Sequence, residues 1–128
     1  MEAGTCFLIV DKQMDDHLWV VLSDPKVDDQ KVLVVNLNTP TEKKEKVCLL
    51  QPGDHPWIRK TTCVNYADSW VQPLAQFLEW KHKGIIKLID PMPVAVLERM
   101  RQAVLDSTRI PMDNANLLIA QGLVDDEG

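Results

Sequence analysis

Short apolar runs separated by polar loops dominate the first half of the chain. The runs are rich in valine, isoleucine and leucine, and each has the length of a strand rather than of a helix. The loops between them are of hairpin length and contain Pro, Gly or Asp. We expect strands at 4–11, 17–23, 31–39, 47–50 and 61–66, the first two joined by a hairpin loop at 12–17. This pattern predicts a small antiparallel barrel and does not favour a parallel βαβ sheet.

Helical spacing replaces this pattern in the second half. Apolar residues between Leu74 and Trp80 predict one or two helical turns, and a late strand is expected at 85–89. Asp90 as N-cap, with Pro91 at the first helical position, predicts a helix over 90–107 that packs one apolar stripe against the sheet.

A second short helix is expected within 111–122, with Asp113 or Asn114 as its cap and Gly122 past its end. The fold class is therefore mainly β, with one or two C-terminal helices. We expect a single domain of 128 residues. Its parts are a barrel core (4–66), a connection with the late strand (67–89), a helical part (90–122) and an acidic tail (123–128).

Composition narrows the classes of function. The formal net charge of −5 argues against broad nonspecific binding to nucleic acid, because phosphate contacts supply most of that affinity. A small local cationic pocket remains compatible with it. The apolar runs are too short to span a membrane, and no export signal is evident. Cys6, Cys48 and Cys63 lie in strand-like apolar settings, so we predict a cytoplasmic protein with three free thiols.

The stretch from Gly53 to Tyr66 carries most of the candidate chemistry. Pro52, Gly53 and Asp54 are typical of a turn, and the β-branched residues from Thr61 onward favour a strand. Alternation along that strand places Thr62, Val64 and Tyr66 on one half-buried face, with Thr62 at the mouth of the core. We expect His55, Arg59 and Thr62 to converge on one solvent-accessible pocket.

Several segments resemble the PemK/MazF class of bacterial toxins, small SH3-like barrels that cut RNA. The matching segments are 19–23, which is similar to strand two of that class, 32–39, which ends in a hydroxyl, and 62–66. The G-D-H-P-W-I sequence at 53–58 is similar to the turn of one subset. The resemblance covers about residues 4–70. Ala3-Gly4 stands where the family has an arginine-glycine pair, and His17-Leu18 where it tends to have arginine-proline.

This resemblance implies a metal-independent endoribonuclease that cuts single-stranded RNA through 2′-hydroxyl attack. It also implies a homodimer, an antitoxin protein as partner, and neither a cofactor nor a bound metal. Because the family's arginines are absent, the chemistry would run through the His55 loop.

Cleavage of this kind needs a proton-transferring group and cations that stabilise charge on phosphorus. On this interpretation the catalytic residues are His55 as acid or base, Arg59 as the charge clamp and Thr62 as a phosphate-binding hydroxyl. The substrate-binding candidates are Lys60, Thr39, His17 and Trp57, with Trp57 stacking on a base. We expect His55→Ala to reduce cleavage on the order of 100-fold or more while hardly changing the fold.

Each of these residues also has a purely structural interpretation. His55 could hydrogen-bond Asp54 or a backbone carbonyl, Thr39 could be a plain strand-end hydroxyl, and Trp57 could belong to the core.

The lysine-rich loop at 41–46 is a weak candidate for nucleic-acid binding, because its glutamates offset its lysines. Trp70 and Trp80 are candidates for a partner surface.

Two hypotheses follow: a toxin-like endoribonuclease, and a non-catalytic barrel that binds a protein or RNA. A buried His55 whose ring is hydrogen-bonded inside the loop would favour the second.

Overall fold

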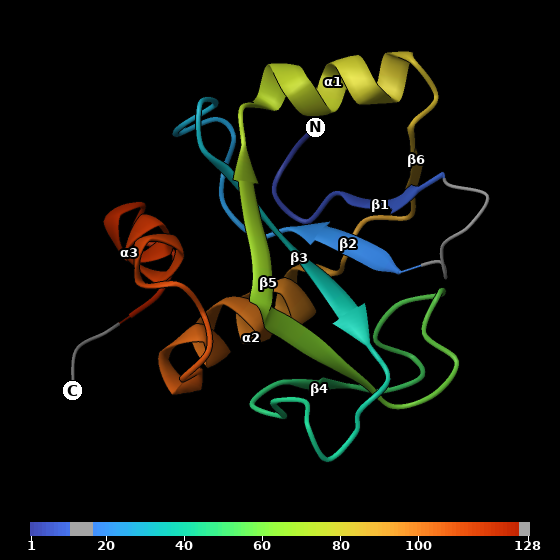
Figure 1. Cartoon of the computed structure of the whole chain (residues 1–128), viewed down its shortest axis with the longest axis vertical. Helices are drawn as coiled ribbons and strands as arrows, with labels where there is room; N and C mark the ends of the chain where they lie inside the picture. The colour runs from blue at the N-terminus through green and yellow to red at the C-terminus, as the bar shows by residue number, and fades with distance from the viewer. Residues whose placement is uncertain (11–16, 126–128) are drawn as a thin grey trace.

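The computed structural model describes residues 1–10 and 17–125, and within them the chain forms a six-stranded antiparallel sheet and three α-helices (Figure 1). The strands are β1 (Cys6–Ile9), β2 (Leu18–Val21), β3 (Val32–Asn38), β4 (Leu49–Leu50), β5 (Thr62–Gln72) and β6 (Ile86–Ile89). Their order across the sheet is β4-β5-β3-β2-β1-β6. The sheet curls into a half-barrel.

Both faces of the sheet are covered, which explains why its strands read as continuous apolar runs. The inner face, which includes Val35 and Tyr66, packs against helix α2 (Val94–Gln102) and helix α3 (Met112–Ala120). The outer face, which includes Phe7 and Val34, packs against Phe77 of helix α1 (Leu74–His82). Figure 1 shows α1 on one side of the strands and α2 with α3 on the other.

The expected barrel of five strands is only partly correct. The late strand β6 pairs with β1 along Cys6–Ile9, so it belongs to the sheet rather than to a separate connection. Within the described residues β4 and β6 do not pair, and the sheet therefore has two open edges.

Strand β5 is longer than expected and contains a bulge. Asn36 pairs with Asn65 and Val34 with Trp70, so two positions along β3 correspond to five along β5. The polar residues in this bulge break the apolar alternation, and the strand was therefore expected to end at Tyr66. The bulge is held by α3, because Asn114 Nδ2 donates to Ser69 Oγ at 2.9 Å.

The predicted helix start at Asp90 is wrong. Helix α2 begins at Val94 with Pro93 as its N-cap, and a short 3₁₀ helix at Ala103–Asp106 continues it. A residue that precedes proline is disfavoured in the helical region, so Met92 stays extended and donates its N–H to Gly4 O at 2.8 Å. Helix α3 is likewise capped by Pro111 rather than by Asp113 or Asn114. Gly122, with φ of 71°, follows its end as predicted.

The C-terminal tail is partly packed. Val124 is buried in the inner core, whereas residues 126–128 lie outside the described part of the chain, as does most of the expected hairpin loop at 12–17. Among the described residues, no helix has the length and apolar character needed to cross a membrane.

Tyr66 and the three cysteines are buried. The Tyr66 hydroxyl is buried and donates to Met100 O at 2.6 Å, which ties β5 to α2. Cys6, Cys48 and Cys63 are free and buried. Burial raises the pKa of the Cys6 thiol to about 12.

The outer face carries a cluster of aromatic rings. Trp70 stacks on Trp80 with ring centroids 5.3 Å apart, and both contact Phe77. The two tryptophans are half-buried, so they contribute to packing under α1 as well as to the surface.

Candidate functional site

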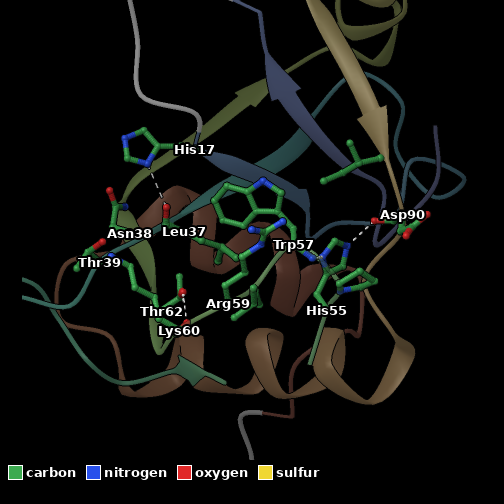
Figure 2. A pocket seen from close by; sticks show the side chains of 13 residues that line it. His17, Leu37, Asn38, Thr39, His55, Trp57, Arg59, Lys60, Thr62 and Asp90 are labelled. Carbon is green, nitrogen blue, oxygen red and sulfur yellow. Dashed lines mark hydrogen bonds between the residues drawn. The ribbon is translucent and has the colours of Figure 1, made fainter. Parts of the chain in front are cut away.

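A hollow of about 820 Å³, called here the first hollow, lies between the ends of β3 and β6 and the segment 55–62 (Figure 2). All seven residues singled out from the sequence line it. Its lining comprises His17, Leu37, Asn38, Thr39, His55, Pro56, Trp57, Ile58, Arg59, Lys60, Thr62, Ile89 and Asp90.

The turn before this segment is fixed to α2. Gly53 has a φ of 102°, which favours glycine, and Asp54 Oδ2 accepts the N–H of Gln51 at 2.7 Å. The same oxygen accepts a hydrogen bond from Arg99 Nη2 at 2.9 Å. The Gln51 N–H first, and the Arg99 guanidinium in addition, lower the pKa of Asp54. The turn therefore has a fixed position relative to the core.

His55 is buried, and both of its ring nitrogens are hydrogen-bonded. Nδ1 accepts the N–H of Trp57 at 3.0 Å, so Nε2 carries the proton and donates to Asp90 O at 2.6 Å. The ring is thus neutral and links the loop to the end of β6. This matches the structural alternative, in which His55 ties down a backbone carbonyl. In this arrangement neither nitrogen is free to move a proton.

Arg59 and Lys60 are the cations of the first hollow. Both are exposed, and neither forms an ion pair within 4.0 Å in the part of the chain that the structure describes. Figure 2 shows Arg59 beside Trp57, with both side chains directed into the hollow. The charges of Arg59 and Lys60 are therefore available to an anionic ligand.

The hydroxyls and the amide lie around these cations. Thr62 is buried and its hydroxyl donates to Lys60 O at 2.9 Å, so the oxygen can only accept a further bond. Thr39 is exposed at the end of β3. Asn38, half-buried, donates from Nδ2 to Asn36 Oδ1 at 3.1 Å.

His17 stands at the margin of the first hollow. Its Nδ1 lies 3.2 Å from Leu37 O and donates to it, which leaves Nε2 unprotonated in the neutral ring. The ring is half-buried and is separated from the Trp57 side chain in Figure 2.

The sequence analysis did not identify the apolar lining of the first hollow or the carboxylate of Asp90 in it. Leu37, Ile58 and Ile89 supply apolar surface, and Asp90 follows β6. Asp90 was expected to cap a helix, and no local signal in the sequence indicated that β6 would end beside the His55 loop. Within the described residues, no group of three or more His, Cys, Asp or Glu side chains is placed to hold a metal ion.

No protein-family model matches the chain, and searches of curated proteins and of solved structures give no significant match.

Proposed function

We propose that the first hollow binds a segment of single-stranded RNA and that the chain acts as a binding module. One observation carries this proposal: a concave site combines a tryptophan that is half-buried against the core with two exposed cations that lack an anionic partner among the described residues. Single-stranded nucleic acid is recognised by this combination, since bases stack on aromatic rings and phosphates pair with Lys and Arg.

The polar groups around Trp57 fit the same ligand. Arg59 offers paired N–H donors to a phosphate, and Lys60 adds a point charge. Thr39 and Asn38 can hydrogen-bond a sugar hydroxyl or a base edge. Leu37, Ile58 and Ile89 provide the apolar surface against which an unstacked base can lie.

Binding without cleavage is favoured by the state of His55. Its two hydrogen bonds occupy both ring nitrogens, so the expected acid–base group is engaged in structure. Membership of the PemK/MazF class, endoribonuclease activity, a homodimer, an antitoxin partner and a cytoplasmic location all stay predictions.

Binding to a labelled oligouridine of about ten nucleotides tests the proposal. We expect measurable affinity at low salt, and a loss of tenfold or more in the double variant Arg59→Ala/Lys60→Ala, because each phosphate contact contributes electrostatically. The control variant Lys81→Ala/Lys83→Ala removes the same charge at the C-terminal end of α1 and should bind like the native chain. Equal affinity of the two variants would contradict the proposal.

The same samples test cleavage. If the bound RNA remains intact, the binding module stands. Products with a 2′,3′-cyclic phosphate end, formed without divalent metal, would restore the nuclease hypothesis. Cleavage would then require another acid–base group, or a rearrangement that frees a ring nitrogen of His55.

A further inference from the structure

A second, smaller hollow lies between β5 and the loop that follows β3. It has a volume of about 290 Å³ and is lined by residues 41 and 43–45 of that loop, by residues 63–65, 67 and 68 of β5 and by Arg109. Its cations are Lys43, Lys44 and Arg109, and its acids are Glu45 and Asp68.

The loop that forms this second hollow is fixed at several points. Lys46 Nζ donates to the carbonyl oxygens of Thr41 and Lys44, at 2.5 and 3.1 Å, and so closes the loop on itself. Arg109 Nη1 donates to Lys43 O at 2.5 Å and joins the loop to the segment after the 3₁₀ helix. The cations are therefore presented on an ordered framework.

Of the two glutamates that were expected to offset these lysines, Glu45 is directed to the segment after the 3₁₀ helix rather than to a lysine. Glu45 accepts hydrogen bonds from Ser107 Oγ at 2.6 Å and from the N–H of Thr108 at 2.9 Å. Asp68 accepts from Asn65 Nδ2 at 2.7 Å. The ammonium groups of Lys43 and Lys44 have no ion-pair partner within 4.0 Å in the described parts, 1–10 and 17–125.

The two hollows are close neighbours. Asn38 lines the first hollow and pairs across the strands with Cys63, which lines the second. Thr62 and Cys63 are adjacent in β5 and belong to one hollow each. Only residue 40 separates Thr39 of the first hollow from Thr41 of the second.

We propose that the second hollow is a phosphate subsite for the same RNA, reached by a strand that leaves the first hollow past Asn38 and Thr39 and crosses the end of β3. This inference rests on the proposed function. Lys43, Lys44 and Arg109 bind the backbone there, and Arg109 adds donors beyond the one that it gives to Lys43 O. The subsite is sequence-independent, because phosphate contacts position a strand without reading its bases.

RNAs of two lengths distinguish binding at this subsite from binding at the first hollow, because only the longer one can reach both. Binding of a uridine trinucleotide and of an oligouridine of about ten nucleotides is measured for the native chain and for three double variants. These are Lys43→Ala/Lys44→Ala, Arg59→Ala/Lys60→Ala and the control Lys81→Ala/Lys83→Ala. Lys43, Lys81 and Lys83 are exposed and Lys44 is half-buried, so unfolding curves of the variants are recorded beside that of the native chain to show that each is folded.

We expect Lys43→Ala/Lys44→Ala to bind the trinucleotide like the native chain and the longer RNA about fivefold to tenfold more weakly. Its dependence of log Kd on log salt should be shallower by about 0.7 for each phosphate that the variant no longer neutralises. If this variant binds the longer RNA as the control does, while Arg59→Ala/Lys60→Ala binds it weakly, the second subsite is refuted and the first hollow stands. If the native chain binds neither RNA, the proposed function and the subsite both fall.

Discussion

At the scale of single residues, His55 shows how a side chain with catalytic potential can serve the fold. Its buried imidazole accepts the N–H of Trp57 and donates to the carbonyl oxygen of Asp90, and both hydrogen bonds are partly shielded from solvent. Buried groups of this kind are costly when their partner is removed. The sequence-based expectation that the fold is insensitive to His55 is therefore replaced by the opposite one.

We predict that His55→Ala lowers the free energy of unfolding by about 1–3 kcal/mol, since the buried ring is lost and two part-buried backbone groups lose their partner. Urea unfolding at neutral pH measures the change. The exposed His82 on α1 provides the matched control, and His82→Ala should leave the midpoint nearly unchanged. Coincident unfolding curves for the two variants would show that the His55 ring is not structural.

Cys6 makes a residue-scale prediction about alkaline pH. Burial, the largest cause, raises its pKa from an ordinary 9.0 to about 12 in the folded chain. Below pH 9 the thiol is protonated in both states, and its stabilising contribution is fully present. Between pH 9 and 12 the unfolded chain releases the proton while the folded chain keeps it, so the free energy of unfolding falls.

In Cys6→Ala the decline of stability above pH 9 should be shallower than in the native chain, although Tyr66 and Cys48, whose pKa values are also raised by burial, continue to contribute. Unfolding in urea across this pH range gives both slopes. Identical slopes would mean that the Cys6 thiol is accessible in the folded state.

At the scale of elements, helix α2 fixes the loop that carries Arg59 and Lys60. Arg99 of α2 reaches Asp54 at 2.9 Å and Leu49 O at 3.3 Å, and so connects the helix to the turn and to β4. A site loop that is fixed in advance loses less conformational entropy when ligand binds.

Arg99→Ala should accordingly speed amide hydrogen exchange over 51–61 and weaken RNA binding a few-fold. The global stability should change by less than about 1 kcal/mol, because the ion pair is exposed to solvent. Lys83→Ala, which removes the exposed pair with Glu79 on α1, is the control and should leave loop exchange unchanged. Native-like exchange over 51–61 in Arg99→Ala would mean that the turn is held by other contacts.

The elements also show what the sequence could and could not predict. Strands buried on both faces, such as Val32–Asn38, were located because their apolar runs have strand length. The second half of β5 was missed because its bulge interrupts alternation, and a bulge depends on α3, which lies far away in sequence. The start of α2 was misplaced because Asp90-Pro91 is a strong local signal, whereas Pro93 keeps Met92 extended against Gly4.

The sequence indicated which residues line the candidate site but not the hydrogen bonds that they form. Seven residues from three segments of the chain line one hollow, as the hairpin pattern and the turn at Gly53 indicated. A bond from His55 to a backbone carbonyl was one of the alternatives, but the identity of that carbonyl could not be foreseen, because Asp90 is 35 positions away and is brought near by the pairing of β6 with β1.

At the scale of the whole molecule, charge is distributed unevenly. The chain has 14 Lys and Arg residues against 19 Asp and Glu, yet among the described residues the two hollows are lined by five cations and three acids. An acidic protein repels nucleic acid from most of its surface, so such a distribution confines binding to one side and makes it steeply dependent on salt.

The most direct test of RNA binding in the first hollow is to titrate ¹⁵N-labelled protein with oligouridine and map the amide shifts. The largest shifts should fall in the segments 37–39, 55–62 and 89–90, with residues of α1 unaffected. Shifts confined to the aromatic face around Trp70 and Trp80, or no saturable shifts at all, would contradict the assignment of the first hollow as an RNA site.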